Sequence, residues 1–390
     1  MVRFFDHVLD APTRLRDGTH RAATLDETWS RFSRVAKRAG ITRLADLTGL
    51  DTLGIPVFAA IRPMGKSLST QQGKGVTAAA ARVSALMESL ETFSAEEVSG
   101  KLVHGSARAL AKKRRVVDVR ALPRPRGRLD RDARWAWVEG FDLVAGEPIL
   151  VPLQAVTLDT TFKRPPVFDI SSNGLASGNV LVEAVVHGLC EVIERDAEAA
   201  WRRAGGDRRI VLDSIGDRTC RALIEQIAST GARVFVWDLA SEVGIATIGC
   251  AIMEDPREPA WRTLGFYQGF GAHLVPEVAI ARAITEAAQT RLTYIAGGRD
   301  DFFPFDYERA TDPELNADLW ERLAAPCEEP VAFADLPRIA TRGLGEDLEA
   351  LLAALAGEQV IVVDLTHPAL RVPVVKVLVP GRATDVEALG

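Results

Sequence analysis

The sequence is poor in cysteine and contains no closely spaced cysteine pair. Its four cysteines, Cys190, Cys220, Cys250 and Cys327, lie 30 or more residues apart, whereas zinc ribbons and knuckles need pairs only a few residues apart. This spacing excludes those zinc motifs and predicts no disulfide framework. We therefore expect isolated thiols in a reducing cytoplasm.

Long apolar runs and an excess of positive charge are also missing. The first ten residues are too polar for a signal peptide, and no apolar run approaches the ~20 residues of a membrane span. The formal net charge of −6 over 390 residues predicts no general affinity for nucleic acid. The basic stretch 112–115 is typical of a solvated charge run. The sequence favours a cytoplasmic globular protein without a membrane or nucleic-acid partner.

The sequence does contain a mixture of helix and strand patterns. Thr24 and Glu27 form a capping box, and apolar residues at helical spacing follow up to Gly40. We predict a buried strand over 57–61, a loop over 64–75, helices over 77–95, 180–201 and 277–295, and strands over 135–141, 149–153, 234–239, 245–253, 263–270 and 360–365. This irregular order favours an α+β fold, and no repeat of fixed period is visible.

Two of the predicted helices carry carboxylates along one face. Glu88 and Glu91 fall beside the apolar face of the helix over 77–95, together with Ser84. Five polar residues of the helix over 180–201 lie within roughly 80° of one another, namely Glu183, His187, Glu191, Glu194 and Glu198. Like charges at this spacing repel, and a hard cation such as Mg2+ prefers oxygen ligands. The alternative is a solvated face balanced by basic side chains, and His187 is more typical of a packed or capping histidine than of a ligand.

The helix over 277–295 carries Arg282, Glu286, Gln289 and Thr293 on one face. A guanidinium such as that of Arg282 can clamp phosphate oxygens, although a surface pair with Glu286 is the simpler interpretation. Two glycine-containing loops, 73–75 and 172–179, precede the other two helices, and such loops let anions reach backbone N–H groups. Neither is a Walker sequence, and an ordinary helix-entry turn explains either loop alone.

Taken together, these motifs resemble the YcaO family. The matching runs are Gly73 to Gly75 with Ser84 to Glu91, then Ser172 to Asn179 with Glu183 and Glu191 to Asp196, and finally Arg282 with Thr285 to Arg291. The segment 18–28 resembles the family's N-terminal region, in which a basic and a hydroxyl residue approach the nucleotide. One departure is Thr92, where the family commonly has arginine. The resemblance extends from about residue 18 to about residue 380.

The resemblance implies a YcaO-type fold of mixed sheets and packed helices, with an ATP site between them. It also implies activation of a peptide-bond oxygen by phosphorylation, with ATP and Mg2+ as cofactors. The implied Mg2+ ligands are Glu88, Glu91, Glu183, Glu191 and Glu194. The implied ATP contacts are Arg21, Thr28, Lys74, Ser84, Asn179, Arg195 and Arg282, with Glu286 and Gln289 behind them or facing the substrate. Glu191, Glu194, Arg195 and Arg282 are the residues expected to be catalytic.

The N-terminal half indicates one branch of the family. Segments 18–21, 40–43, 51–57 and 60–63 resemble YcaO proteins that work with a TfuA partner, and the resemblance implies thioamide formation with external sulfide. Azoline-forming members often end in alternating prolines, whereas Pro373 and Pro380 are isolated here. No peptide-recognition module is fused, so we expect a peptide or protein substrate and a separate TfuA-like partner. Two alternative functions stay open: an azoline-forming cyclodehydratase, and a non-catalytic ATP-binding accessory factor for ribosomal-protein methylthiolation. A homodimer also stays possible.

The domain prediction is a single YcaO domain over 1–390. We expect an N-terminal lobe over about 1–111, a proline- and arginine-rich surface linker over about 112–131, and a main nucleotide-binding lobe over about 132–390. Cys190 is expected to point into the core, because it lies ~170° from the centre of the acidic stripe. Arg291 lies about 180° from Arg282 on the same helix, so changes there should matter less for nucleotide binding.

Overall fold

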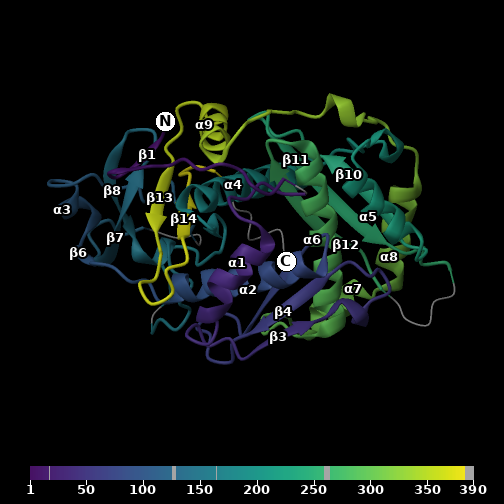
Figure 1. Cartoon of the computed structure of the whole chain (residues 1–390), viewed down its shortest axis with the longest axis horizontal. Coiled ribbons are helices and arrows are strands. Elements are labelled where there is room, and N and C mark those ends of the chain that lie inside the picture. The colour runs from purple at the N-terminus through teal and green to yellow at the C-terminus, as the bar shows by residue number, and fades with distance from the viewer. Residues whose placement is uncertain (17, 125–128, 164, 259–263, 383–390) are drawn as a thin grey trace.

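The computed structural model describes residues 1–16, 18–124, 129–163, 165–258 and 264–382. In this part of the chain the strands form four antiparallel sheets that pack against helices (Figure 1). The predicted α+β class, with several sheets packed against helices, is confirmed, and the pairing within each sheet is antiparallel. Thr263, linker residues 125–128 and the tail from Thr384 to Gly390 lie outside the described residues. None of the described helices combines the length and apolar character that a membrane crossing requires.

The longer helices are α1 (Leu25–Phe32), α2 (Ala78–Glu96), α4 (Leu181–Ala204), α5 (Arg218–Ala228), α6 (Pro276–Ala296), α8 (Pro313–Ala324) and α9 (Leu344–Ala354), and the shorter ones are α3 (Ala107–Leu110) and α7 (Pro304–Ala310). The strands are β1 (Arg3–Phe4), β2 (His7–Val8), β3 (Arg43–Asp46), β4 (Val57–Ile61), β5 (Thr70–Lys74), β6 (Val103–Gly105), β7 (Trp135–Asp142), β8 (Glu147–Pro152), β9 (Leu175–Ser177), β10 (Arg233–Asp238), β11 (Ala246–Met253), β12 (Tyr267–His273), β13 (Ile361–Asp364) and β14 (Val374–Leu378).

Two parts of the chain have the same order of elements. A three-stranded sheet in the order β3-β4-β5 is followed by α2, and a second sheet in the order β10-β11-β12 is followed by α6. In each part the helix packs directly on the last strand, because glycines in that strand leave room for the helix backbone. A Cβ atom on Gly73 would lie 1.9 Å from the backbone nitrogen of Ala85, and one on Gly269 would lie 2.2 Å from that of Ala287.

The six-stranded sheet lies between two parts of the hydrophobic core. Its strand order is β6-β7-β13-β14-β9, and β8 pairs with β7. Alternate residues of β14 point to opposite faces: Val374 joins the core that includes Leu86 of α2, and Val375 joins the core that includes Leu189 of α4. The sheet therefore positions α2 and α4 relative to each other.

The core continues across the expected lobe boundary. β6, from the first lobe, pairs with β7 of the second. Val117, Val119 and Leu122 are buried in the same cluster as Trp137. The described part of the expected surface linker is thus partly built into the core, and the division into lobes stays a prediction.

Three of the differences from the sequence predictions concern the first helix, the strand expected from residue 263 and the loop expected over 64–75. The first helix ends at Phe32 and continues as a 3-10 turn over Ser33–Val35, short of Gly40. The strand expected from residue 263 begins at Tyr267. The predicted loop over 64–75 contains β5, whose buried Gln71 and Gln72 give no apolar alternation. Pairing with β4 along its whole length makes this polar segment a strand.

Candidate functional site

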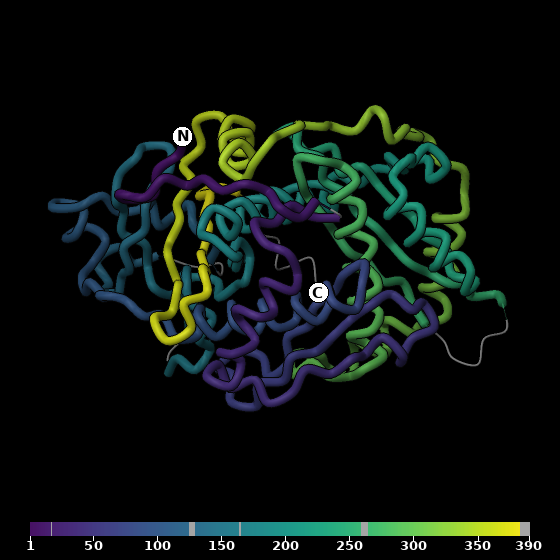
Figure 2. The backbone as a smooth tube through the Cα atoms, viewed as in Figure 1, coloured from purple at the N-terminus to yellow at the C-terminus, as the bar shows by residue number. Residues whose placement is uncertain are grey.

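The three helices that carry the sequence motifs come together near the centre of the molecule. α2, α4 and α6 lie around the middle of Figure 1, with α1 beside them. Figure 2 shows the N-terminal segment crossing α4 before it enters α1. Hydrogen bonds fix this crossing, because the backbone N–H of Ala22 donates to Glu183 at 2.8 Å and Arg31 donates to the carbonyl of Asn179 at 2.8 Å.

Glu88, Glu91 and Glu191 form an acidic group between α2 and α4. Burial is the main cause that raises the pKa of Glu88 and of Glu191 to about 7. Burial, followed by the charges of Glu88 and Glu191, raises the pKa of Glu91 well above its ordinary value. The Glu88 side chain is nevertheless open to solvent, so it lines a space that protein surrounds. Three carboxylates that repel one another in such a space fit a divalent cation.

The acidic group fits Mg2+ better than a metal held by the protein alone. Among the described residues no three His, Cys, Asp or Glu side chains are close enough to form a complete metal centre. Mg2+ does not need such a cage, because it keeps several waters and is held by one or two carboxylates and by substrate phosphates. The arrangement therefore suits a metal that arrives with a nucleotide.

The other two predicted metal ligands, Glu183 and Glu194, are engaged by protein donors. Glu183 is buried and accepts from Ala22 and from Asn179, whose amide nitrogen lies 3.3 Å away, and Arg21 lies 3.4 Å away. Glu194 is buried and accepts from the backbone N–H of Ala272 at 2.9 Å. Glu194 lies near the group of three, because its charge adds to the raised pKa of Glu191. The role of Glu183 and Glu194 as metal ligands stays a prediction.

Basic side chains balance part of the acidic face of α4 and the neighbouring Glu286 of α6. Arg195 contacts Glu198 at 2.8 Å, Glu286 at 3.2 Å and Glu194 at 3.4 Å. Lys74, at the end of β5, contacts Glu286 at 2.5 Å. Burial alone would raise the pKa of Glu286, but Lys74 and Arg195 outweigh it and lower the value to about 2. The surface pair of Arg282 with Glu286 considered from the sequence is replaced by this network.

Arg282 contacts a histidine. Its Nη1 lies 2.9 Å from Nε2 of His187 on α4, while the Nε atom of Arg282 is buried without a hydrogen-bond partner among the described residues. Burial, and then the charges of Arg282, Arg21 and Lys74, lower the pKa of His187 well below its ordinary value. Arg21, Lys74 and Arg282 form a basic group around the neutral His187 ring. This basic group adjoins the acidic group, because Lys74 acts on Glu88 and Arg282 acts on Glu191.

The remaining residues predicted to contact ATP lie on α1, α2 and α6 or just before α4. The hydroxyl of Thr28 donates to the Oδ1 atom of Asn179 at 3.0 Å, and both side chains are buried. Gln289 donates to the carbonyl of Gln72 at 2.9 Å, which ties α6 to β5. Ser84 lies on α2 and is partly exposed. Their contacts to a nucleotide stay predictions.

Sequence reasoning missed Lys376. This lysine is buried in β14, and its Nζ donates to the carbonyl of Ser171 at 2.5 Å. Burial lowers its pKa to about 8, while the charges of Glu191 and Glu91 act in the opposite direction. Lys376 therefore supplies a second positive charge near Glu191, in addition to that of Arg195. The signal was a single lysine inside the apolar run 374–379.

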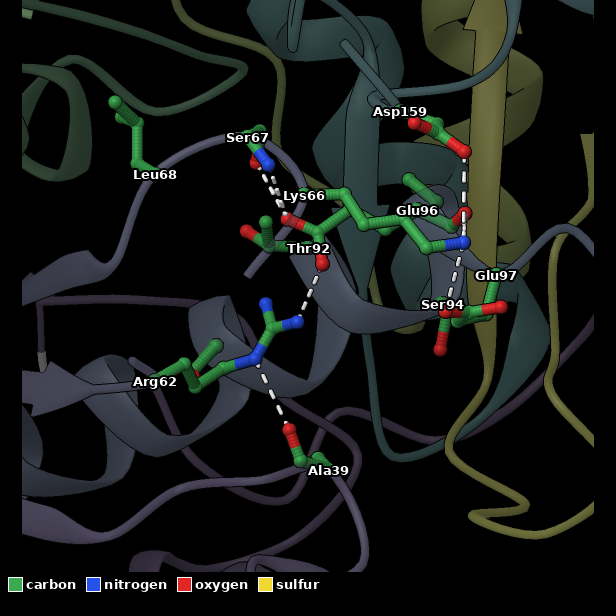
Figure 3. Close-up of polar contacts among 12 residues, drawn as sticks. Ala39, Arg62, Lys66, Ser67, Leu68, Thr92, Ser94, Glu96, Glu97 and Asp159 are labelled. Carbon is green, nitrogen blue, oxygen red and sulfur yellow. Dashed lines mark hydrogen bonds and ion pairs between the residues drawn. The ribbon is translucent and has the colours of Figure 1, made fainter. Parts of the chain in front are cut away.

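A second charged cluster fixes the loop between β4 and β5. Figure 3 shows Arg62 between the carbonyl of Ala39 and the carboxylate of Glu96, both of which accept hydrogen bonds from it. Ser67 donates to the other Glu96 oxygen through its backbone at 2.9 Å and its hydroxyl at 2.6 Å. Lys66 pairs with Glu97 at 2.8 Å. The cluster holds the loop against the end of α2, and the buried Arg62 and Glu96 side chains pair with each other.

Three further sequence expectations concern single residues. Cys190 is buried, and burial raises the pKa of its thiol to about 12, as expected of a core residue. Thr92 donates to the carbonyl of Glu88 at 2.9 Å, within its own helix. Arg291 does point away from Arg282, but it is fully buried and bound by Asp51 and Glu254 at 2.8 and 2.6 Å. Its replacement therefore affects folding, which the sequence did not indicate.

The chain matches a family model described as YcaO cyclodehydratase, binding ATP and Mg2+, over residues 72–383. The description names both cofactors expected from the sequence. An uncharacterized protein from the tfuA 3' region of Rhizobium leguminosarum bv. trifolii is 36% identical, over 94% of this chain and 89% of that protein.

Two solved structures share the fold. YcaO from Methanopyrus kandleri, bound with AMPPCP and Mg2+, is 28% identical with a TM-score of 0.77, over 97% of this chain and 96% of that chain. A heterocyclase in complex with substrate and cofactor has a TM-score of 0.81 at 22% identity. The match covers 97% of this chain and 54% of the heterocyclase chain.

Proposed function

Because the chain belongs to the YcaO family, we propose that it uses ATP and Mg2+ to phosphorylate the oxygen of a peptide bond. One observation carries this proposal: an acidic group and a basic group lie side by side at the meeting point of α2, α4 and α6. The acidic group contains Glu88, Glu91 and Glu191, and the basic group contains Arg21, Lys74 and Arg282. A Mg2+–nucleotide complex presents the complementary charges, because the metal suits the carboxylates and the phosphates suit the basic side chains.

The residues of this site hold and orient the nucleotide. Glu191 and Glu91 would hold Mg2+, and the metal would supply positive charge that offsets the charge developing on the transferred phosphoryl group. Arg282 and Lys74 orient phosphate oxygens, and Arg195 keeps Glu194 and Glu286 in place. Most of the catalytic effect then comes from positioning and electrostatics, as expected for phosphoryl transfer.

The proposed overall reaction exchanges oxygen for sulfur. The amide oxygen forms a bond to the γ-phosphorus, ADP leaves, and the amide nitrogen gives up its proton as the C=N bond forms. Hydrosulfide then adds to the carbon, inorganic phosphate leaves with the former amide oxygen, and the nitrogen regains a proton. The products are a thioamide, ADP and phosphate.

Two observations favour the thioamide branch with a TfuA-type partner. A relative that is 36% identical over nearly the whole chain comes from a tfuA region. The four cysteines are free thiols, and burial raises the pKa of Cys190 to about 12, so this thiol is a poor sulfur carrier. External sulfide, delivered by a partner, is the matching source.

An azoline-forming cyclodehydratase is the second candidate, favoured by the family description and by the fold shared with a heterocyclase. In that reaction a cysteine, serine or threonine of the peptide attacks instead of sulfide. A non-catalytic ATP-binding accessory factor is the third candidate, and it would hydrolyse no ATP in response to a peptide.

Intact-mass analysis separates these candidates. The purified chain is incubated with ATP, Mg2+, sulfide and peptides encoded beside its gene, with and without a TfuA-type protein. We expect a product that is heavier by the difference between sulfur and oxygen, formed only with the partner. A product lighter by one water would assign azoline formation, and an unchanged peptide without ADP release would leave the accessory role.

A further inference from the structure

The contact between His187 and Arg282 fixes the tautomer of the histidine. The Nη1 atom of Arg282 lies 2.9 Å from Nε2 of His187. A guanidinium can only donate, so Nε2 must accept and cannot carry a proton. The proton of the neutral ring is therefore on Nδ1, and His187 presents an N–H donor on the side opposite to Arg282.

That donor lies in the site without an acceptor. Nδ1 of His187 is buried and has no hydrogen-bond partner among the described residues, and the same holds for Nε of Arg282. A buried donor left unpaired costs about 1–3 kcal/mol. Two such donors, on α4 and α6, indicate a ligand that accepts hydrogen bonds from both helices.

The charges around His187 define the chemistry of this ligand. After burial, the groups that act most strongly on the ring are Arg282, Arg21, Lys74 and His273, all of which are basic. The Nδ1 atom of His273 accepts a hydrogen bond from the backbone N–H of Val275 at 3.1 Å. The proton of the neutral His273 ring is therefore on Nε2, which can donate a hydrogen bond on the other side of the ring. An anion with several oxygen atoms suits such surroundings.

We propose that His187 binds a phosphate of the nucleotide, with its Nδ1–H donating to a phosphate oxygen while its Nε2 orients Arg282 toward the same group. The proposal rests on the proposed nucleotide site and adds a residue to it. It revises the sequence interpretation of His187 as a packed histidine, because a ring that only packs needs no buried donor.

The two nitrogens can be tested separately. His187→Asn keeps an N–H donor near the position of Nδ1 and loses the acceptor for Arg282, whereas His187→Phe loses both. We expect His187→Phe to bind AMPPCP with Mg2+ about tenfold or more weakly, and His187→Asn to recover part of that loss. His104→Phe, which changes an exposed residue of β6, is the matched control and should bind as the unaltered protein does.

Nitrogen NMR of the unaltered protein gives a readout that a structural role would not move. The His187 ring should carry its proton on Nδ1, and the resonance of this N–H should shift when AMPPCP and Mg2+ are added. An unmoved resonance, or His187→Phe binding as tightly as the control, overturns the inference while the nucleotide site stands. If the unaltered protein fails to bind AMPPCP with Mg2+, the proposed function itself is wrong.

Discussion

Glu286 and Glu191 are both glutamates of the central site, yet their surroundings shift their pKa values in opposite directions. Lys74 and Arg195 bind Glu286 and hold its pKa at about 2, whereas burial raises the pKa of Glu191 to about 7. The sequence placed both residues on helix faces near the site. It could not indicate this difference, because the deciding cations come from β5, α4 and β14.

We predict that Glu286→Gln destabilises the nucleotide-free protein by about 3 kcal/mol, because it leaves Lys74 and Arg195 with less compensation in a mostly buried site. Glu286 has a lowered pKa in the folded state, so its contribution is present above pH ~4.5 and is lost as the pH falls toward ~2. Denaturant unfolding near neutral pH measures the effect. Equal stability of the variant and the unaltered protein would contradict the network.

Glu191→Gln should behave in the opposite way. Its folded-state pKa is raised to about 7, so the ionised carboxylate destabilises the metal-free protein as the pH rises from ~4.5 through ~7. The variant should therefore melt at a higher temperature than the unaltered protein at about pH 8, and at a similar temperature at about pH 5. Thermal unfolding in the presence of a chelator measures both. A variant less stable at the higher pH would show that Glu191 is a structural residue.

Arg291→Leu should destabilise the protein by about 3–5 kcal/mol, since it leaves the buried carboxylate of Asp51 and the nearby Glu254 without their cation. Any nucleotide affinity that the folded variant retains should be close to normal, because Arg291 points away from Arg282. Denaturant unfolding and calorimetry check the two statements. Normal stability would refute the buried ion pair.

At the scale of elements, α2 and α6 are placed by glycines in the strands that precede them. The sequence predicted both helices nearly to the residue, because helical periodicity is a local signal. It did not predict that each follows a three-stranded sheet in the same way. The buried polar strand β5 has no apolar alternation, and the two units differ in length, so no fixed period is visible.

Gly269→Ala should weaken this packing. The new Cβ would lie 2.2 Å from the backbone of Ala287, so β12 and α6 must separate, at a cost of about 1–3 kcal/mol or more. Gly216→Ala is the control, because nothing lies within 4 Å of its added Cβ. We expect a lower melting temperature and weaker nucleotide binding only for Gly269→Ala. Equal melting of both variants would mean that the close approach does not position α6.

At the scale of the whole molecule, the site depends on segments far apart in the sequence. The site residues on α2, α4 and α6 could be predicted from the sequence, because each motif is a local pattern. The family resemblance then assigned the three motifs to one site. Lys376 could not be predicted as a site residue, because a single lysine in an apolar strand forms no local motif. Only the sheet that carries β14 between α2 and α4 brings it to Glu191 and Glu91.

Calorimetric titration of AMPPCP into the protein tests the central claim most directly, because it needs neither the peptide nor the partner. We predict binding that requires Mg2+, is abolished by a chelator, and is weakened about tenfold or more by Glu191→Gln, a loss of ~1.4 kcal/mol or greater. Glu346→Gln, which changes an exposed acid on α9, should leave the affinity unchanged. Binding that is indifferent to Mg2+, or equal in all three proteins, would contradict a Mg2+–ATP site built by α2, α4 and α6.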